Sequence, residues 1–192
     1  MTGAHRAVPN EVDDPEVSVT SVVPSASAMR DFGSLLADVL KAGDLVVLTG
    51  DLGAGKTTLT QGIGAGLHVR GQVASPTFII AREHPPVARP DGTRGPTLVH
   101  VDAYRLGSLD EVDALDLDAS LDEAVTVVEW GEGWVESLAQ DRLEITLQRP
   151  RGGTLADDDL DDAAAGERVV TVRAVGARWA DVALPDADPV AG

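Results

Sequence analysis

The fold of this chain is decided at Gly50-Asp51-Leu52-Gly53-Ala54-Gly55-Lys56-Thr57-Thr58. These residues follow the pattern G-x-x-x-x-G-K-[ST], in which glycines allow successive backbone N–H groups to face one concavity. The lysine and the N-terminus of a following helix add positive charge, and the Thr57 hydroxyl is suited to completing a magnesium site. The stretch therefore predicts a loop that binds phosphate.

The flanking residues favour this interpretation over a chance match. The chain contains 20 glycines, so an accidental glycine-rich turn has to be considered. Residues 44–49, however, have the pattern of a buried strand, and residues 57–67 have an apolar face at helical spacing. Lys41 and Lys56 are the only lysines in the sequence. We expect Lys56 to be solvent-facing within the loop and not part of the core.

Composition limits the class of protein. A chain of 192 residues with 43% hydrophobic content can form one globular α/β domain with a substantial core. Cysteine is absent, which removes disulfides and cysteine-bound metals. No signal-peptide pattern and no apolar stretch of about 20 residues is evident, so we expect a cytoplasmic protein without a membrane partner. The net charge of -17 disfavours direct binding to a long nucleic acid. Any nucleic-acid partner would then arrive on another protein.

Charge and proline patterns suggest the domain organisation. Residues 1–16 are expected to form a disordered tail, residues 17–183 one phosphate-loop domain, and residues 184–192 a frayed end. Within the domain, residues 151–167 contain a Gly-Gly pair and an aspartate run, which predict a flexible acidic insertion. A proline-rich exposed connection is expected at 84–95.

Apolar periodicity predicts the remaining elements. A helix capped by Ser25 or Ser27 is expected to run to about residue 42, with Gly43 as its stop. One or two amphipathic helices are expected within 108–124, and a short helix within 133–139. Strands are expected at 17–23, 97–101, 124–128, 142–149 and 168–175.

Two carboxylates follow apolar strands and are candidates to serve the phosphate loop. Asp102 follows the strand at 97–101, and Glu129 follows the strand at 124–128. In a sheet built beside the loop strand, both would emerge at its carboxyl edge, where nucleotide hydrolysis needs a carboxylate near magnesium. Residue pattern leaves open which of the two is the main metal-side carboxylate. His100 is interpreted as a packing or hydrogen-bonding residue, and Thr77 as either a sensor of the γ-phosphate or a strand cap.

Four motifs together resemble the signatures of the TsaE (YjeE) family, the small ATPase of the bacterial machinery that installs threonylcarbamoyladenosine on tRNA. The resemblance extends from about residue 17 to residue 175. The motifs are the loop itself, Ser75-Pro76-Thr77-Phe78, His100-Val101-Asp102-Ala103-Tyr104-Arg105 and Val128-Glu129-Trp130.

The resemblance implies a fold, cofactors and partners. The fold would be a single α/β domain whose mixed sheet is parallel around the loop strand and antiparallel toward the C-terminus. The cofactors would be ATP and Mg²⁺, and the partners TsaD and TsaB, with tRNA reached only through the complex. Hydrolysis would be weak in the isolated protein and stimulated by these partners.

The resemblance also assigns roles to residues. Thr57 and Glu129 would hold magnesium, while Asp102, Glu129 and Thr77 would serve catalysis or switching. Ser25 and Arg168 are candidates for contacts that family members make from the first helix and from a late basic residue. The residues expected to bind nucleotide are Asp51, Leu52, Gly53, Ala54, Gly55, Lys56, Thr57, Thr58, Trp130, Ser25 and Arg168.

Other functions share parts of this pattern. A small-molecule kinase has the same loop but needs an acceptor pocket and usually an arginine-bearing lid, for which Arg82, Arg89 and Arg94 could be mistaken. A GTPase is disfavoured because Asn10 is the only asparagine, so an N-K-x-D guanine motif cannot be formed. A module that uses nucleotide as a structural clip would keep Lys56 but show no turnover.

Overall fold

The computed structural model describes residues 16–75, 81–105, 121–150 and 166–187. Two α-helices are found in these ranges, α1 (Ala26–Ala37) and α2 (Lys56–Gly66). Short 3-10 turns are η1 (Ala103–Arg105), η2 (Glu136–Leu138) and η4 (Ala177–Trp179). The strands are β1 (Glu16–Val23), β2 (Leu45–Thr49), β3 (Ala81–His84), β4 (Thr97–Asp102), β5 (Ala124–Glu129), β6 (Arg142–Gln148) and β7 (Arg168–Val175).

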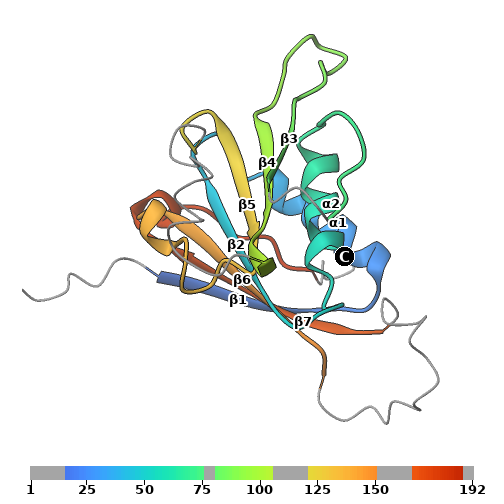
Figure 1. Ribbon diagram of the computed structural model, residues 1–192, viewed down its shortest axis with the longest axis vertical. Coiled ribbons are helices and arrows are strands. Elements are labelled where there is room, and N and C mark those ends of the chain that lie inside the picture. The colour runs from blue at the N-terminus through green and yellow to red at the C-terminus, as the bar shows by residue number, and fades with distance from the viewer. Residues whose placement is uncertain (1–15, 76–80, 106–120, 151–165, 188–192) are drawn as a thin grey trace, which may run out of the picture.

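These strands form one mixed sheet in the order β1-β7-β6-β2-β5-β4-β3. The strand that feeds the loop, β2, is parallel to both of its neighbours, β5 and β6, and β4 is parallel to β5. The outer pairs β6–β7, β1–β7 and β3–β4 are antiparallel. The expected α/β domain, parallel around the loop strand and antiparallel toward the C-terminus, is therefore confirmed, with an additional antiparallel strand at the opposite edge (Figure 1).

The core has two layers, one on each face of the sheet. Both helices cover one face (Figure 1), where Met29 and Phe32 of α1 and Leu59 and Ile63 of α2 join a single buried cluster with inward residues of the central strands. On the other face, a smaller cluster is built from residues such as Leu45 of β2 with the segment after β5. Within the described ranges, no helix has the length and apolar character needed to cross a bilayer.

Helices α1 and α2 approach each other closely through glycines. A Cβ atom added to Gly33 would lie 2.5 Å from the carbonyl oxygen of Leu59, and one added to Gly62 would lie 2.8 Å from the Cα of Arg30. Because no side chain separates the backbones at these points, the pair packs as one unit against the sheet. This packing fixes the direction in which the N-terminus of α2 points.

The first helix begins where the sequence predicts but ends five residues earlier than expected. Ser25 is its N-cap, and its side chain accepts the Ala28 N–H at 3.1 Å. The helix ends at Ala37, whereas the apolar pattern predicted about residue 42. The pattern continues past the helix because Leu40, in the following turn, is still buried in the core. The buried Leu40 therefore extended the apolar pattern beyond the helix, although it is not a helical residue.

Three other expectations differ from the structure. The short helix expected at 133–139 is reduced to the three-residue turn η2, because Gly133 has a φ of +80°, outside the range of a right-handed helix. The chain after residue 183 is not frayed as far as it is described, since Leu184 and Ala187 pack against the core. Glu16, assigned to the tail, is the first residue of β1.

Several expectations lie outside the described residues. These are most of the N-terminal tail, Thr77, residues 108–120 of the helices expected within 108–124, residues 151–165 of the acidic insertion expected at 151–167, and residues 188–192.

The glycine contact between the helices can be tested by Gly62→Ala. In an open helix this change would stabilise, since alanine is favoured over glycine by about 1 kcal/mol. Here the added methyl group would collide with the Arg30 backbone, so we expect the free energy of unfolding to fall by about 1–3 kcal/mol. Urea unfolding followed by circular dichroism measures the change. The control is Ala65→Ser on the exposed side of α2, expected to change stability by less than about 0.5 kcal/mol. A stabilised Gly62→Ala protein would show that the helices are not in backbone contact.

Candidate active site

The glycine loop leads from the end of β2 directly into the N-terminus of α2. Gly50 has a φ of +147°, and a Cβ there would collide with the carbonyl oxygen of Leu147 on β6, so only glycine fits. Gly55 is the N-cap of α2 with a φ of +107°, and no side chain caps the helix. The first N–H groups of α2 are therefore left without a side-chain acceptor. Together with the helix dipole, they form a site suited to an anion.

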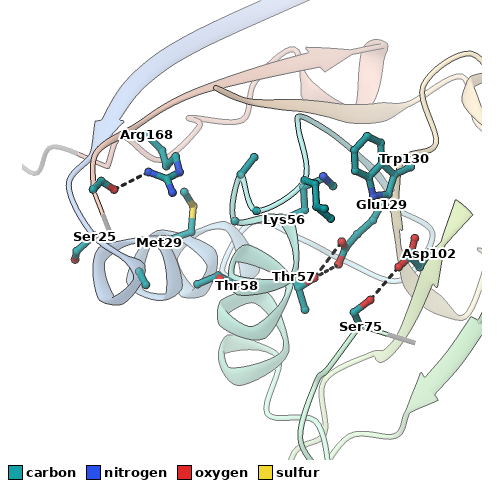
Figure 2. A pocket seen from close by; sticks show the side chains of 16 residues that line it. Ser25, Met29, Lys56, Thr57, Thr58, Ser75, Asp102, Glu129, Trp130 and Arg168 are labelled. Carbon is teal, nitrogen blue, oxygen red and sulfur yellow. Dashed lines mark hydrogen bonds between the residues drawn. The ribbon is translucent and has the colours of Figure 1, made fainter. Parts of the chain in front are cut away.

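A cavity of about 360 Å³ opens over this loop. Its walls come from the loop, the start of α1, the ends of β4 and β5, and the start of β7 (Figure 2). The lining residues are Ser25, Ala26, Met29, Leu52, Gly53, Ala54, Gly55, Lys56, Thr57, Thr58, Ser75, Asp102, Glu129, Trp130, Gly166 and Arg168.

Lys56 is buried, contrary to the expectation that it faces solvent. Only 5% of the residue is exposed, and its Nζ donates to the carbonyl oxygens of Gly50 at 2.6 Å and Asp51 at 3.0 Å. Nζ also lies 3.6 Å from the ring centroid of Trp130, a cation–π contact. Burial lowers the pKa of Lys56, an effect opposed by the nearby carboxylates of Glu129, Asp102 and Asp51. The ammonium is thus held beneath an aromatic ring at the edge of the cavity (Figure 2).

Trp130 is held in an unusual backbone conformation. Its φ is +62°, a region that bulky residues rarely occupy, and its N–H donates to the Leu48 carbonyl of β2 at 2.9 Å. The ring packs at a tilt against Tyr104, with 5.1 Å between centroids. Strain of this kind persists where the surrounding structure imposes it, often at functional sites. In this protein it aims the indole ring over Lys56.

The two candidate carboxylates lie side by side, because Asp102 and Glu129 are partners in the parallel register of β4 and β5. The Thr57 hydroxyl donates to the Glu129 carboxylate, at 2.9 Å from Oε1 and 3.1 Å from Oε2. The Ser75 hydroxyl donates to Asp102 Oδ2 at 2.9 Å. Figure 2 shows both contacts on the same side of the cavity, next to Trp130. The structure therefore joins the loop to two carboxylates from neighbouring strands.

The opposite end of the cavity is formed by α1 and the start of β7. Arg168 is 7% exposed, and its Nη1 donates to the carbonyl oxygens of Gly166 and Glu167, each at 3.0 Å. Burial lowers the pKa of Arg168, and the positive charge of Arg149 adds to the effect. Figure 2 shows Ser25 and Met29 beside this arginine. The cavity thus has a buried cation at each end, in a protein whose net charge is -17.

The structure brings together most of the residues expected at the site. All of them line the cavity except Asp51, whose carbonyl contacts Lys56, and Thr77, which lies outside the described residues. Residue patterns missed four residues of the lining: Ala26, Met29, Ser75 and Gly166. Ser75 stands in a quoted motif, so its position was available as a signal. Met29 was assigned to an apolar helical stripe, and nothing in that pattern distinguishes a cavity wall from core.

A parallel strand, a glycine loop and an uncapped helix N-terminus, flanked by carboxylates at the ends of adjacent strands, define a P-loop nucleotide-binding protein. The model of one family, described as "Threonylcarbamoyl adenosine biosynthesis protein TsaE", matches residues 23–154. The chain belongs to the TsaE family.

Relatives agree with this assignment. The chain is 56% identical over 153 residues to the "tRNA threonylcarbamoyladenosine biosynthesis protein TsaE" of Streptomyces coelicolor, a match that covers 79% of this chain and 94% of the relative. It is 40% identical over 151 residues to the Bacillus subtilis protein of the same name, covering 78% and 82% of the two chains. The crystal structure of Bacillus subtilis YdiB superposes with a TM-score of 0.59 at 33% identity, covering 86% of this chain and 90% of that one.

Family membership establishes the general function. The protein is a P-loop ATPase that acts in the biosynthesis of threonylcarbamoyladenosine on tRNA, and its family implies that it binds nucleotide. The sequence-based assignment to this family and to this pathway is therefore confirmed.

Lys56→Ala tests the loop directly, with Lys41→Ala as a matched control because Lys41 is the other lysine and is exposed. A charge-assisted hydrogen bond contributes about 1.5–3 kcal/mol, so we expect ATP affinity to fall about 10- to 100-fold in Lys56→Ala and to stay unchanged in Lys41→Ala. Titration calorimetry measures affinity, and circular dichroism checks that both variants are folded. Equal affinity in the two variants would contradict a phosphate-binding role for Lys56.

Proposed function

We propose that the protein hydrolyses ATP in a magnesium-dependent reaction that is slow in the isolated chain and is stimulated by homologues of TsaD and TsaB. The observation that carries the proposal is the contact between the Thr57 hydroxyl and the Glu129 carboxylate at the mouth of the phosphate loop. This contact brings a hydroxyl of the loop within hydrogen-bond distance of a carboxylate at the end of a strand. P-loop enzymes use the same two kinds of group to bind magnesium.

The donor chemistry of this pair fits magnesium. Mg²⁺ prefers hard oxygen ligands and is commonly bound by one or two protein groups together with substrate phosphates and water. Thr57 and Glu129 would supply the protein oxygens, and the cavity beside them leaves room for a triphosphate. When bound, the ion would neutralise charge on the phosphates. Asp102 would then be the carboxylate that acts on water, rather than the principal metal-side group.

The chain's own groups account for the remaining requirements of hydrolysis. The N–H groups at the start of α2 would bind phosphate oxygens, and the Lys56 ammonium would exchange its two carbonyl partners for phosphate. This exchange is favourable because phosphate carries a full negative charge and a carbonyl does not. Asp102, oriented by Ser75, would hold the attacking water. Trp130 would shield the site from bulk solvent, and Thr77 stays a candidate for sensing the γ-phosphate.

The far end of the cavity suits the rest of the nucleotide. Arg168, Ser25 and Met29 offer a cation, a hydroxyl-bearing helix start and an apolar side chain. Because the Ser25 hydroxyl oxygen already accepts the Ala28 N–H, its expected contact with nucleotide would be made by its O–H as a donor or through its backbone. This arrangement would place phosphates at Lys56 and the base or ribose near Arg168.

Partners supply what the isolated chain lacks. The strongly negative net charge disfavours tRNA as a direct ligand, so the tRNA would be reached through the TsaD and TsaB homologues. Hydrolysis in P-loop enzymes depends on the positions of water and charge, and partner proteins can raise its rate by ordering those groups. Tyr104, 63% exposed and packed on Trp130, would allow a bound partner to influence the site.

Phosphate transfer distinguishes hydrolysis from kinase activity. The protein is incubated with ATP labelled at the γ-phosphate, with and without a panel of small hydroxylated acceptors. We expect label to appear only as inorganic phosphate, because in the proposed mechanism Asp102 would hold a water molecule as the attacking group. Label recovered on an acceptor would replace the hydrolase proposal with the small-molecule kinase.

Partner dependence is tested by steady-state phosphate release from the protein alone, with each homologue and with both. We expect the highest rate only when both are present.

In the same phosphate-release assay, Glu129→Gln and Asp102→Asn should each lower turnover about 100-fold, the scale of a lost catalytic carboxylate. Asp102→Asn should keep nucleotide affinity. Asp122→Asn, an exposed acid just before β5, is the control and should match wild type. Full turnover by the lone subunit, unchanged by partners, would contradict the proposed dependence.

A further inference from the structure

A buried histidine that does not line the cavity contacts Glu129. His100 of β4 is completely buried, and its Nε2 lies 2.8 Å from Glu129 Oε1. It precedes Asp102 by two residues and therefore lies on the same face of the strand. It does not line the cavity. His100 thus reaches Glu129 through the protein interior, whereas Thr57 reaches it from the phosphate loop.

The hydrogen-bonding surroundings of the ring define its role. Nε2 faces a carboxylate oxygen, which can only accept when ionised, so Nε2 carries the proton. Nδ1 is buried and has no hydrogen-bond partner among the described residues. A proton on Nδ1 would therefore be a buried donor without an acceptor, which is costly. The tautomer with hydrogen on Nε2 satisfies the contact that the structure contains, and His100 donates to Glu129.

Glu129 depends on such donors because it is only 3% exposed. A buried carboxylate without donors is strongly destabilised, and among the described residues two side chains donate to it, Thr57 and His100. Their positions differ: Thr57 belongs to the proposed magnesium site, while His100 lies on the side away from the cavity. The histidine contact is therefore the one that can hold the carboxylate in place both before and after the ion binds.

We propose that His100 is a positioning residue for the metal-side carboxylate: its Nε2–H orients Glu129 toward the phosphate loop and thereby sets the affinity of the site for magnesium. This inference rests on the proposed magnesium site of Thr57 and Glu129 and adds a group that no sequence motif assigned to it. Groups that orient metal ligands through hydrogen bonds typically change metal affinity or activity by 10- to 100-fold, about the scale expected here.

The test replaces His100 by each of two amide side chains that differ in length, glutamine and asparagine. The side-chain nitrogen of His100→Gln can occupy the position of Nε2 and donate to Glu129, whereas that of His100→Asn is too short to do so. Both are polar and uncharged. The control is His84→Asn, because His84 of β3 is also a buried histidine, with 3% exposed, and does not contact Glu129.

Two affinities are measured for the full-length protein. The first is the affinity for ADP in the presence of a chelator, and the second is the affinity for Mg²⁺ at saturating ADP. Both can be followed by tryptophan fluorescence, since Trp130 lies over Lys56 in the cavity. We expect His100→Asn to weaken Mg²⁺ binding about 10-fold or more, His100→Gln to keep most of it, and His84→Asn to match wild type. Metal-free ADP affinity should be unchanged throughout.

The alternative outcomes each have a definite meaning. Equal Mg²⁺ affinity in His100→Asn and wild type overturns the inference. An equal loss of Mg²⁺ affinity in the Asn and Gln variants also overturns it, because that result would indicate a packing role for His100.

The variant Glu129→Gln separates a failure of this inference from a failure of the proposed function. If Glu129→Gln leaves Mg²⁺ affinity intact, the magnesium site itself is wrong. If it lowers Mg²⁺ affinity while His100→Asn does not, only the role of His100 is rejected. Thermal unfolding of each variant confirms that differences are not caused by loss of the fold.

Discussion

Parallel register among β2, β5 and β4 is the constraint on which the rest of this structure depends. Leu48, just before the loop, pairs with Glu129, and Glu129 pairs with Asp102. Because these strands run in the same direction, the start of the phosphate loop and both carboxylates meet at one edge of the sheet. A shift of one residue in either pairing would turn a carboxylate to the opposite face. The chemistry of the site is thus set by the backbone hydrogen bonds that pair these strands.

Close backbone contacts then position the helix that completes the site. Gly33 and Gly62 allow α1 and α2 to touch, and Gly50 allows the loop to pass against β6. At each of these points a side chain would push the backbones apart. The uncapped N-terminus of α2 is therefore held over the strand ends, and the same helix pair provides one wall of the cavity with Met29. Stability and function share these contacts, since the packing that buries the core also aims the anion site.

The cavity contains positively charged side chains although the molecule as a whole is strongly negative. A protein with a net charge of -17 repels nucleotide at long range, yet its cavity holds Lys56 and Arg168 at opposite ends. Both cations are buried, and burial lowers the pKa of each. Low dielectric surroundings strengthen the attraction of these charges for phosphate while surface charge is screened by salt. Local burial, and not net charge, therefore makes the cavity suited to an anion.

Local patterns in the sequence were sufficient for the parts of this protein that depend on neighbouring residues. The glycine loop, a serine cap at residue 25 or 27, the buried strands and the carboxylates that follow them are all encoded within short segments. The motifs among them resembled one family, and that resemblance implied the mixed sheet. Sequence patterns gave wrong predictions where a residue is buried by contacts with residues that are distant in the sequence. Leu40 kept an apolar spacing beyond the end of α1, and Leu184 packed on the core although its segment resembles a frayed end.

Only the tertiary structure decided how the site is connected. Lys56 is buried beneath Trp130 because β5 ends next to the loop, and no pattern within the loop reports that neighbour. The hydrogen bond from His100 to Glu129 and the one from Ser75 to Asp102 join residues 29 and 27 positions apart. The sequence by itself determined which chemical groups are available and at which strand ends they stand. Their partners were decided by folding, because burial and hydrogen bonding between distant residues depend on how strands and helices pack, a property that no short stretch contains.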